Sequence, residues 1–212
     1  MEFQEALNKE FSFTGRQGRD NLPALACAKM HWGPAMDHGR HTLARMLRDM
    51  EVREGVEVGT HSGFSAELWA RHCSTLHLTC VDPYAAYAVR PIQAEHDKIY
   101  ASAVKRLKPY NVDIIRERSL DAVESFEDRS LDFVNIDGNH EFDWVVQDLI
   151  HWAPKVRDGG VVMLHDYCNF WRGGVVLAVN AYTTAHRVDP WYVTGRRDKT
   201  PTAFWERGAA TL

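Results

Sequence analysis

The sequence predicts an α/β protein with a doubly wound, mostly parallel seven-stranded sheet and an antiparallel hairpin at its C-terminal edge. Two observations support this fold class. From Gly55 onward, short apolar runs alternate with longer stretches of helical periodicity, a pattern typical of parallel strands covered by helices on both faces. Near the C-terminus the alternation stops, and two short apolar runs flank a charged turn, which predicts the antiparallel hairpin.

Length and composition fit one soluble domain. The chain has 212 residues, 45% hydrophobic and 25% charged, which suits a globular domain with a single core. We therefore interpret residues 1–212 as one domain. A formal net charge of -4 without a long Lys/Arg run argues against a nucleic-acid partner. No apolar stretch reaches the roughly 20 residues of a membrane helix, so we expect no membrane partner either.

The cysteines and the first residues predict a cytoplasmic protein. The N-terminus MEFQEALNKEF is acidic and amphipathic, unlike a signal peptide. The cysteines form no CxxC pair, as expected of reduced, buried thiols rather than of a zinc site or a disulfide framework. They are Cys27, Cys73, Cys80 and Cys168.

Residues 1–50 precede the alternating pattern. A polar stretch at 12–21 is followed by helical pieces within 22–50, interrupted at Gly33-Pro34. We expect this segment to act as a helical lid or an oligomerisation segment. Its helical spacing is clearest for Leu43, Met46, Leu47 and Met50.

The elements predicted after Gly55 follow from apolar runs and their bounding turns. The strands are Gly55–Gly59, Leu76–Val81, Val112–Arg116, Leu131–Ile136 and Gly160–Leu164, with the hairpin strands Trp191–Thr194 and Ala203–Glu206. The helices are Ala66–Cys73, Pro91–Lys108, Asp121–Phe126, Glu141–Ala153 and Trp171–His186. The last helix, with Val175, Val179 and Tyr182 on one side, is expected to pack on the sheet or on a second subunit.

Ligands of open α/β sheets bind at the carboxyl ends of the strands. The first predicted strand leads through the segment EVGTHSG, residues 57–63, into a helix. Glycines four apart permit a sharp turn and a close ligand, and a helix start offers free N–H groups. The spacing is neither G-x-G-x-x-G nor a Walker loop. The segment thus predicts either a ligand site or a tight turn without one.

Asp82 and Ser119 follow the next two strands. Asp82 lies 19 residues beyond Gly63, where an acid accepts the hydroxyls of a ribose. The alternative is a helix cap, but its pairing with the glycine loop favours the ribose. Ser119 either hydrogen-bonds an adenine edge or caps the next helix.

The strand ends that follow are the most informative. Asp137 and His140 come after Leu131–Ile136, and His165 and Asp166 come after the fifth strand. Neighbouring parallel strands bring these four side chains to one edge, where two carboxylates need a cation or a shared proton. Carboxylates suit Mg²⁺, and a histidine ligand makes Mn²⁺ or Fe²⁺ reasonable.

The segments VEVGTHSGFS, CVDPY and LDFVNIDGNHEFDWVVQDLIHWAPKVRDGGVVMLHDY resemble the class I S-adenosylmethionine-dependent methyltransferases. Within that class, the chain is most similar to small-molecule O-methyltransferases of the catechol type and to the macrocin and cephalosporin-hydroxylase-like group. The resemblance covers Gly55 to Tyr167 and, more weakly, the C-terminal hairpin. Its most specific part is IDGxH…DLxxW.P…GGxxxxHD, whereas the glycine loop alone is common.

The resemblance implies S-adenosylmethionine as cofactor, with Asp82 at the ribose, Ser119 near the adenine and Asp137 beside the sulfonium. It also implies metal ligands at Asp137, His165 and Asp166, with Mg²⁺ or Mn²⁺ as the cation. The methionine part would be surrounded by Glu57, Gly59, Thr60, His61, Gly63 and Ser65, with Ser65 close to its carboxylate.

Two residues depart from the family pattern. His140 stands where the catechol-type enzymes have a lysine base, and His165 stands where an Asp or Glu is usual. A histidine titrates near neutrality, so we assign His140 as the base, with Asp137 as the second catalytic residue. We expect a small-molecule acceptor with a sugar or phenol hydroxyl. Candidates to line its pocket are His31, Trp32, Trp144, Phe170, Trp171 and Arg172, although each alone is better explained as a core or interface residue.

Two other functions remain open. One is a metal-independent N-methyltransferase, or an aminopropyl-transferring relative with the same fold. The other is a non-catalytic binding module, which predicts loss of the glycine loop or of Asp82, and both are present. We also expect a homo-oligomer, a dimer or larger.

Overall fold

A computed structural model describes residues 1–11, 13–16, 28–31, 39–86, 92–168, 170–194 and 200–208, with the backbone alone for 13–16, 28–31 and 170–171. Its helices are α1 (Phe3–Glu10), α2 (Gly39–Asp49), α3 (Phe64–His72), α4 (Gln93–Leu107), α5 (Ser119–Ala122), α6 (Phe142–Trp152) and α7 (Gly174–Ala185). The strands are β1 (Phe13–Arg16), β2 (Ala28–His31), β3 (Glu54–Val58), β4 (His77–Val81), β5 (Val112–Ile115), β6 (Leu131–Ile136), β7 (Val156–Leu164), β8 (Trp191–Val193) and β9 (Ala203–Glu206).

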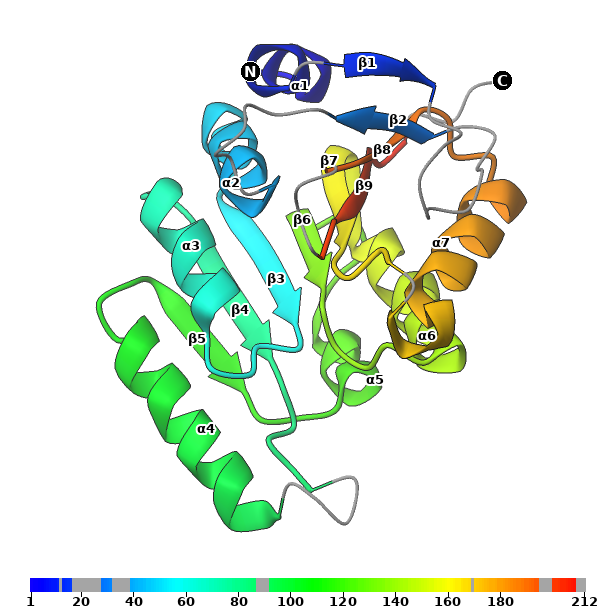
Figure 1. The fold of residues 1–212 in the computed structure, drawn as a ribbon. Coiled ribbons are helices and arrows are strands. Elements are labelled where there is room, and N and C mark those ends of the chain that lie inside the picture. The colour runs from blue at the N-terminus through cyan, green and yellow to red at the C-terminus, as the bar shows by residue number, and fades with distance from the viewer. Residues whose placement is uncertain are drawn as a thin grey trace.

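The strands form one sheet in the order β1-β2-β8-β9-β7-β6-β3-β4-β5. Strands β3 to β7 pair in parallel, whereas β9 runs antiparallel to both β7 and β8. The seven strands from β3 to β9 confirm the predicted mostly parallel sheet with antiparallel C-terminal strands. Figure 1 shows this sheet between its helices, with α3 and α4 on one side and α5, α6 and α7 on the other.

The N-terminal segment differs from the prediction. We expected helical pieces within 22–50, but Ala28–His31 forms β2, which pairs in parallel with β8 and antiparallel with β1. The C-terminal hairpin therefore does not lie at the sheet edge. A four-residue strand shows no clear period in the sequence, and it forms here because an unpaired edge offers backbone donors and acceptors.

Two hydrophobic clusters fill the space on either side of the sheet. One cluster joins β3, β6 and β7 to α6 and α7. It confirms the predicted packing of α7 on the sheet, because Val175 and Val179 are buried in it and Tyr182 packs against it. The other cluster joins α1, α2 and α3 to the opposite face. Helices α1 and α2, which belong to residues 1–50, are thus part of the core.

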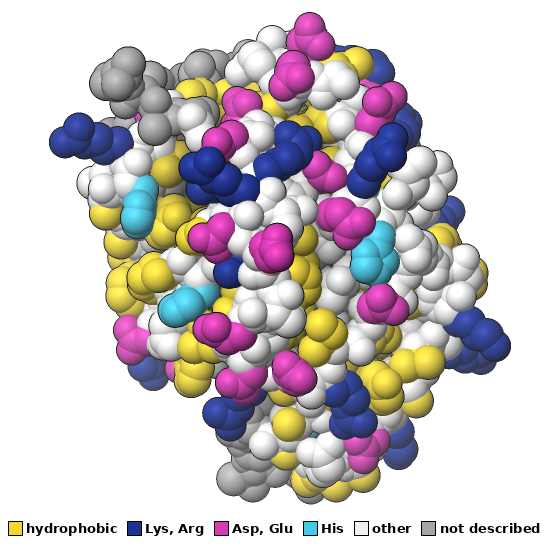
Figure 2. Space-filling model, turned by 180° about the vertical axis from the view of Figure 1, so that it is seen from behind, with side chains coloured by type: hydrophobic (Ala, Val, Ile, Leu, Met, Phe, Trp, Pro, Cys, Tyr) yellow, Lys and Arg dark blue, Asp and Glu magenta, His cyan; other side chains and the backbone are white. Residues whose placement is uncertain are grey.

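The outer surface carries both signs of charge. On the face drawn in Figure 2, acidic and basic side chains of the described residues are interspersed rather than gathered into a field of one sign. Among the helices of the described residues, none is long and apolar enough to cross a membrane.

Asp132 ties together the amino ends of three strands. Its carboxylate accepts backbone N–H groups of Arg53 at 2.6 Å and Glu54 at 2.9 Å, and the side-chain Nε of Arg157 at 2.6 Å. Burial opposes ionisation, but these hydrogen bonds outweigh it and hold the pKa of Asp132 below its usual value. Charged Asp132 therefore stabilises the fold at neutral pH.

Replacing Asp132 with Ala should lower the free energy of unfolding by about 1–3 kcal/mol at pH 7, because two backbone N–H groups and Arg157 lose their acceptor. The folded-state pKa lies below the unfolded one, so this contribution exists above about pH 4 and is lost as the pH falls through the folded value. Urea unfolding at pH 7 and pH 3 measures both effects. The control Asp128→Ala removes an exposed acid paired with Lys155 and should change stability by less than about 0.5 kcal/mol. Equal losses at both pH values for Asp132→Ala would contradict the assignment.

Candidate active site

Backbone hydrogen bonds hold the carboxyl ends of neighbouring strands level. The N–H of Gly59 donates to the carbonyl of Val81 at 2.8 Å, and that of Asp137 donates to Val58 at 2.8 Å. The N–H of His165 donates to Ile136 at 3.0 Å. These bonds continue the parallel ladder one residue past each strand, so the residues predicted at the site lie side by side.

The glycine loop depends on close backbone approach. Gly59 has a φ of +88°, and a Cβ there would lie 2.2 Å from the carbonyl oxygen of Asp137. Gly63, with a φ of +77°, is the N-cap of α3 and has no side chain to occupy the helix start. Both positions therefore require glycine, and the first-turn N–H groups of α3 stay open to a ligand.

Glu57 lies buried beneath this loop, with 1% of its surface exposed. Its Oε1 accepts the Trp69 indole N–H at 3.1 Å and the Asn135 amide at 3.1 Å. Its Oε2 is buried and has no hydrogen-bond partner among the described residues. Burial, with the charge of Asp137 adding to it, raises the pKa of Glu57 to about 8. Such an unpaired oxygen is costly and suits a cationic ligand group.

Asp82 joins the glycine loop to the turn after β4. Its two carboxylate oxygens accept the N–H groups of His61 and Tyr84, each at 2.8 Å. The Tyr84 hydroxyl in turn donates to the carbonyl of His61 at 2.9 Å. The carboxylate thus braces the loop, and each oxygen keeps a second lone pair for a hydroxyl donor.

Ser119 is already engaged within the protein. Its hydroxyl donates to Asp148 of α6 at 2.5 Å and accepts the Trp152 indole N–H at 2.7 Å. The N-cap of α5 is Arg118, so the alternative interpretation of Ser119 as the cap is wrong. Its one proton is directed into the protein, which leaves at most an acceptor lone pair for the adenine edge expected from the sequence.

Asp137, His140, His165 and Asp166 form one cluster at the ends of β6 and β7. His140 Nε2 lies 3.0 Å from an oxygen of Asp166 and 3.6 Å from one of Asp137. His165 Nδ1 lies 3.2 Å from Asp137 and 3.0 Å from Asp166. The four side chains are only 5% to 22% exposed. Each histidine therefore bridges both acids.

The cluster is a balanced set of charges. Burial alone would raise the pKa of Asp137 and Asp166, but hydrogen bonds from the two histidines hold both below their usual values. Burial likewise opposes protonation of His140 and His165, yet the two carboxylates raise the pKa of each to about 9. The near-neutral pKa expected of His140 is therefore wrong for this environment, because two acids stabilise the imidazolium.

The same cluster has the geometry of a cation site. One ligand atom each from Asp137, His140 and Asp166 lie within 4.8 Å of one another. Two carboxylates with one imidazole suit Mn²⁺ or Fe²⁺ better than Mg²⁺. The ligand set predicted from the sequence contains His165 instead of His140, and both histidines contact the same two acids.

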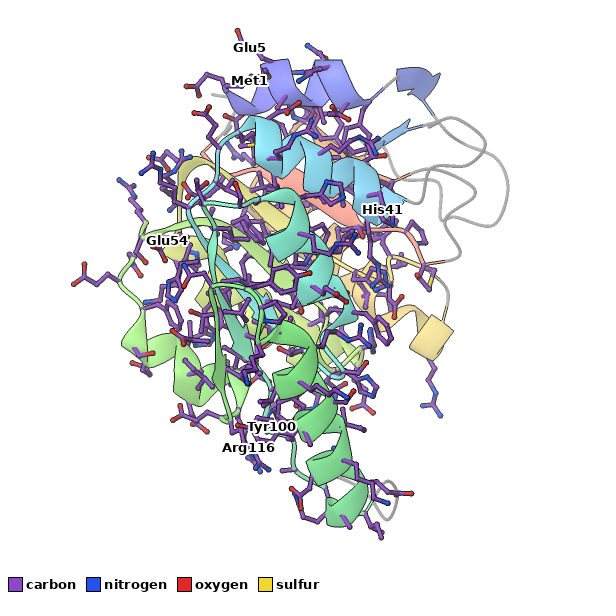
Figure 3. All side chains as sticks on the ribbon, turned by 90° about the vertical axis from the view of Figure 1, so that its left-hand side faces the viewer. Met1, Glu5, His41, Glu54, Tyr100 and Arg116 are labelled. Carbon is purple, nitrogen blue, oxygen red and sulfur yellow. The ribbon has the colours of Figure 1, made fainter. Side chains whose placement is uncertain are left out.

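Arg40 was not foreseen. It is the second residue of α2, and it donates from one terminal nitrogen to Ser65 Oγ at 2.7 Å. Its other terminal nitrogen lies 3.5 Å from His165 Nδ1. Glu54 is the first residue of β3 and marks the amino ends of the parallel strands. Figure 3 shows His41, the neighbour of Arg40, on the opposite side of the molecule from Glu54. The beginning of α2 therefore lies at the carboxyl ends of the strands.

The predicted acceptor pocket is only partly described. Trp144 is 44% exposed on α6, and Arg172 has a left-handed backbone beside the start of α7. Trp32 lies outside the described residues, as do the side chains of His31, Phe170 and Trp171.

Thr60 and His61, the other two residues predicted to bind the cofactor, belong to the glycine loop. Thr60 is buried there and His61 is exposed.

Comparison with known proteins fits this geometry. The model of a methyltransferase domain family matches residues 56–167, more than half of the chain. The chain belongs to this family. The match contains the glycine loop, Asp82 and the four-residue cluster. Residues 56–167 thus form a class I S-adenosylmethionine-dependent methyltransferase domain.

Related proteins and solved structures agree on the fold. Uncharacterized proteins of Sinorhizobium fredii and of Acanthamoeba polyphaga mimivirus are each 29% identical to this methyltransferase domain, over 57% and 59% of the chain. The match covers only 14% and 57% of those relatives' own lengths. The O-methyltransferase TomG of Streptomyces achromogenes, in complex with the cofactor, has a TM-score of 0.56 at 18% identity over 88% of this chain and 84% of its own. The N-methyltransferase NodS of Bradyrhizobium japonicum has a TM-score of 0.54 at 17% identity, with 79% and 94% covered.

The imidazoles of His140 and His165 should titrate near pH 9 in the ligand-free methyltransferase domain, because both contact two carboxylates. Replacing Asp166 with Asn should lower both pKa values, since one anion is lost. NMR of the imidazole nitrogens across pH 5–10 measures this. His72 serves as an internal contrast, because burial and nearby positive charges lower its pKa below 6.5. Titration of His140 at or below 6.5 in the wild-type protein would refute the charge balance.

Proposed function

We propose that this protein is a methyltransferase that uses S-adenosylmethionine to methylate a hydroxyl group of a small molecule, assisted by a divalent cation. The observation that supports it most is the Asp137, His140, His165 and Asp166 cluster beside the glycine loop. Anionic groups stabilise the sulfonium of the donor and hold a cation, and the hydroxyl acceptor needs a group that takes its proton. The cluster offers both kinds of group at one place.

The residues at the strand ends suit the proposed cofactor. The unpaired Glu57 oxygen favours an ammonium group, Asp82 offers lone pairs to ribose hydroxyls, and the glycines admit close approach. We assign cofactor binding to Glu57, Gly59, Thr60, His61, Gly63, Ser65, Asp82, Ser119 and Asp137. When bound, the cofactor supplies a methyl group that its sulfonium already activates for in-line substitution.

Catalysis then needs an oriented acceptor that loses its proton. His140 would take the hydroxyl proton at Nε2 as the new C–O bond forms and the methyl–sulfur bond breaks, with the bonding electrons leaving on sulfur as a neutral thioether. This requires an imidazole that is neutral beforehand. Asp137 and Asp166, with His165, would hold the divalent cation, Mg²⁺ or Mn²⁺, of which Mn²⁺ is the better match for an imidazole ligand. Its charge would acidify the hydroxyl. If Asp137 and Asp166 held a cation, they would stabilise the protonated form of His140 less, and its imidazole would be available as a base.

A metal-independent methyltransferase, including one that methylates nitrogen, is the second candidate. It is favoured by the pairing of both acids with histidines, which compensates their charge without a cation. It predicts full activity after chelation.

Replacing Asp166 with Ala should reduce turnover by at least about 10²-fold while leaving the affinity for S-adenosylmethionine nearly unchanged, because Asp166 acts on the acceptor side. Transfer of a labelled methyl group to a panel of phenols and sugars measures turnover, and calorimetry measures affinity. The control Asp128→Ala should have wild-type values for both.

Two further measurements test the metal and the base. Full activity in EDTA would overturn the metal assignment, and an unchanged rate for His140→Ala would overturn the assignment of His140 as the base.

The affinity for S-adenosylmethionine should rise from pH 6 to about pH 8, because Glu57 has a pKa of about 8 without ligand and must be ionised to pair with an ammonium group. The histidines add to any pH dependence, so Glu57→Gln is compared with the wild type. The variant should bind more weakly and lose the part of the slope between pH 6 and 8. Calorimetry in buffers of different ionisation enthalpy should show more proton release on binding in the wild type than in the variant. Identical pH profiles would contradict the role of Glu57.

A further inference from the structure

We propose that Arg40 of α2 binds the carboxylate of the methionine part of S-adenosylmethionine and thereby ties the N-terminal segment to the occupied cofactor site. The inference rests on the proposed function and assigns a residue of 1–50 to it. It gives the segment predicted as a lid a direct contact with the cofactor.

Arg40 differs from the other arginines of its helix in its partners. Arg45 and Arg48 form ion pairs with Glu10, and Arg48 also pairs with Asp49. Arg40 forms no ion pair with a carboxylate among the described residues; its contacts are the hydroxyl of Ser65 and the ring of His165. A guanidinium has five N–H donors and no acceptor capacity, so most of its hydrogen-bonding capacity stays available.

Arg40 contacts two other elements from its place on α2. One terminal nitrogen donates to Ser65 Oγ of α3, and the other lies 3.5 Å from His165 Nδ1, just after β7. The guanidinium therefore lies between the start of α3 and the four-residue cluster, where an anionic ligand group could accept its remaining N–H donors.

The start of α3 presents the same preference. Ser65 is the second residue of this nine-residue helix, whose first-turn N–H groups have no intrahelical acceptors. The positive end of the helix dipole favours an anion there as well. Ser65, the first turn of α3 and Arg40 therefore converge on one point from two elements.

The charges of the site match those of the cofactor's methionine part. That part has a carboxylate, an ammonium group and a sulfonium. Arg40 would pair with the carboxylate, and Glu57, whose Oε2 has no hydrogen-bond partner among the described residues, would pair with the ammonium group. An anionic group of the acceptor would be the other possible partner of Arg40, and the test separates the two.

The test measures the affinity of the full chain for S-adenosylmethionine and for its decarboxylated analogue by calorimetry. In Arg40→Gln, the dissociation constant for S-adenosylmethionine should rise about 10- to 100-fold, while that for the analogue should stay within about twofold of wild type. Arg40→Lys keeps the charge without the fork and should lose about 3- to 10-fold for S-adenosylmethionine only. The control Arg48→Gln, on the same helix, should bind both ligands as the wild type does.

Equal weakening of both ligands in Arg40→Gln and Arg40→Lys would overturn the proposal in favour of a structural role. Unchanged affinity for both, with a raised KM for the acceptor, would overturn it in favour of acceptor binding. If Arg40→Gln fails to fold, as judged by circular dichroism, Arg40→Lys decides by the same criterion. Failure of the wild type to bind either ligand would instead refute the proposed function, and this inference with it.

Discussion

The register of the parallel strands is the constraint on which the site depends. One backbone hydrogen bond beyond each strand aligns Gly59 with Val81, Asp137 with Val58, and His165 with Ile136. Because these bonds are made by backbone groups, the positions of the acids and histidines follow from strand pairing rather than from side-chain packing. The close passage of Gly59 over the carbonyl of Asp137 then brings the glycine loop against the cluster.

Buried charge is the second determinant of the site. Two carboxylates and two imidazoles lie within a few ångströms of one another and are largely shielded from water. Each acid stabilises the protonated form of both histidines, and each histidine lowers the pKa of both acids. The protonation state therefore belongs to the cluster as a whole, and any cation that enters it changes all four groups.

The N-terminal segment contributes to both the core and the site. Side chains of α1 and α2 pack in the same cluster as α3, so α2 is held firmly against the element that begins at the glycine loop. That packing directs Arg40 onto Ser65 and His165. A residue near the start of the chain thereby joins a site built otherwise from strand ends.

The sequence by itself determined the order of strands and helices from Gly55 onward, because their apolar periods are local. It also placed Asp137, His140, His165 and Asp166 at one edge, because residues that follow neighbouring parallel strands must meet there. Only the tertiary structure decided the addition of β2 to β8, the internal partners of Ser119 and the approach of Arg40, since these contacts join residues far apart in the chain. It also decided the pKa of His140, because that value depends on two carboxylates whose distances no local pattern encodes.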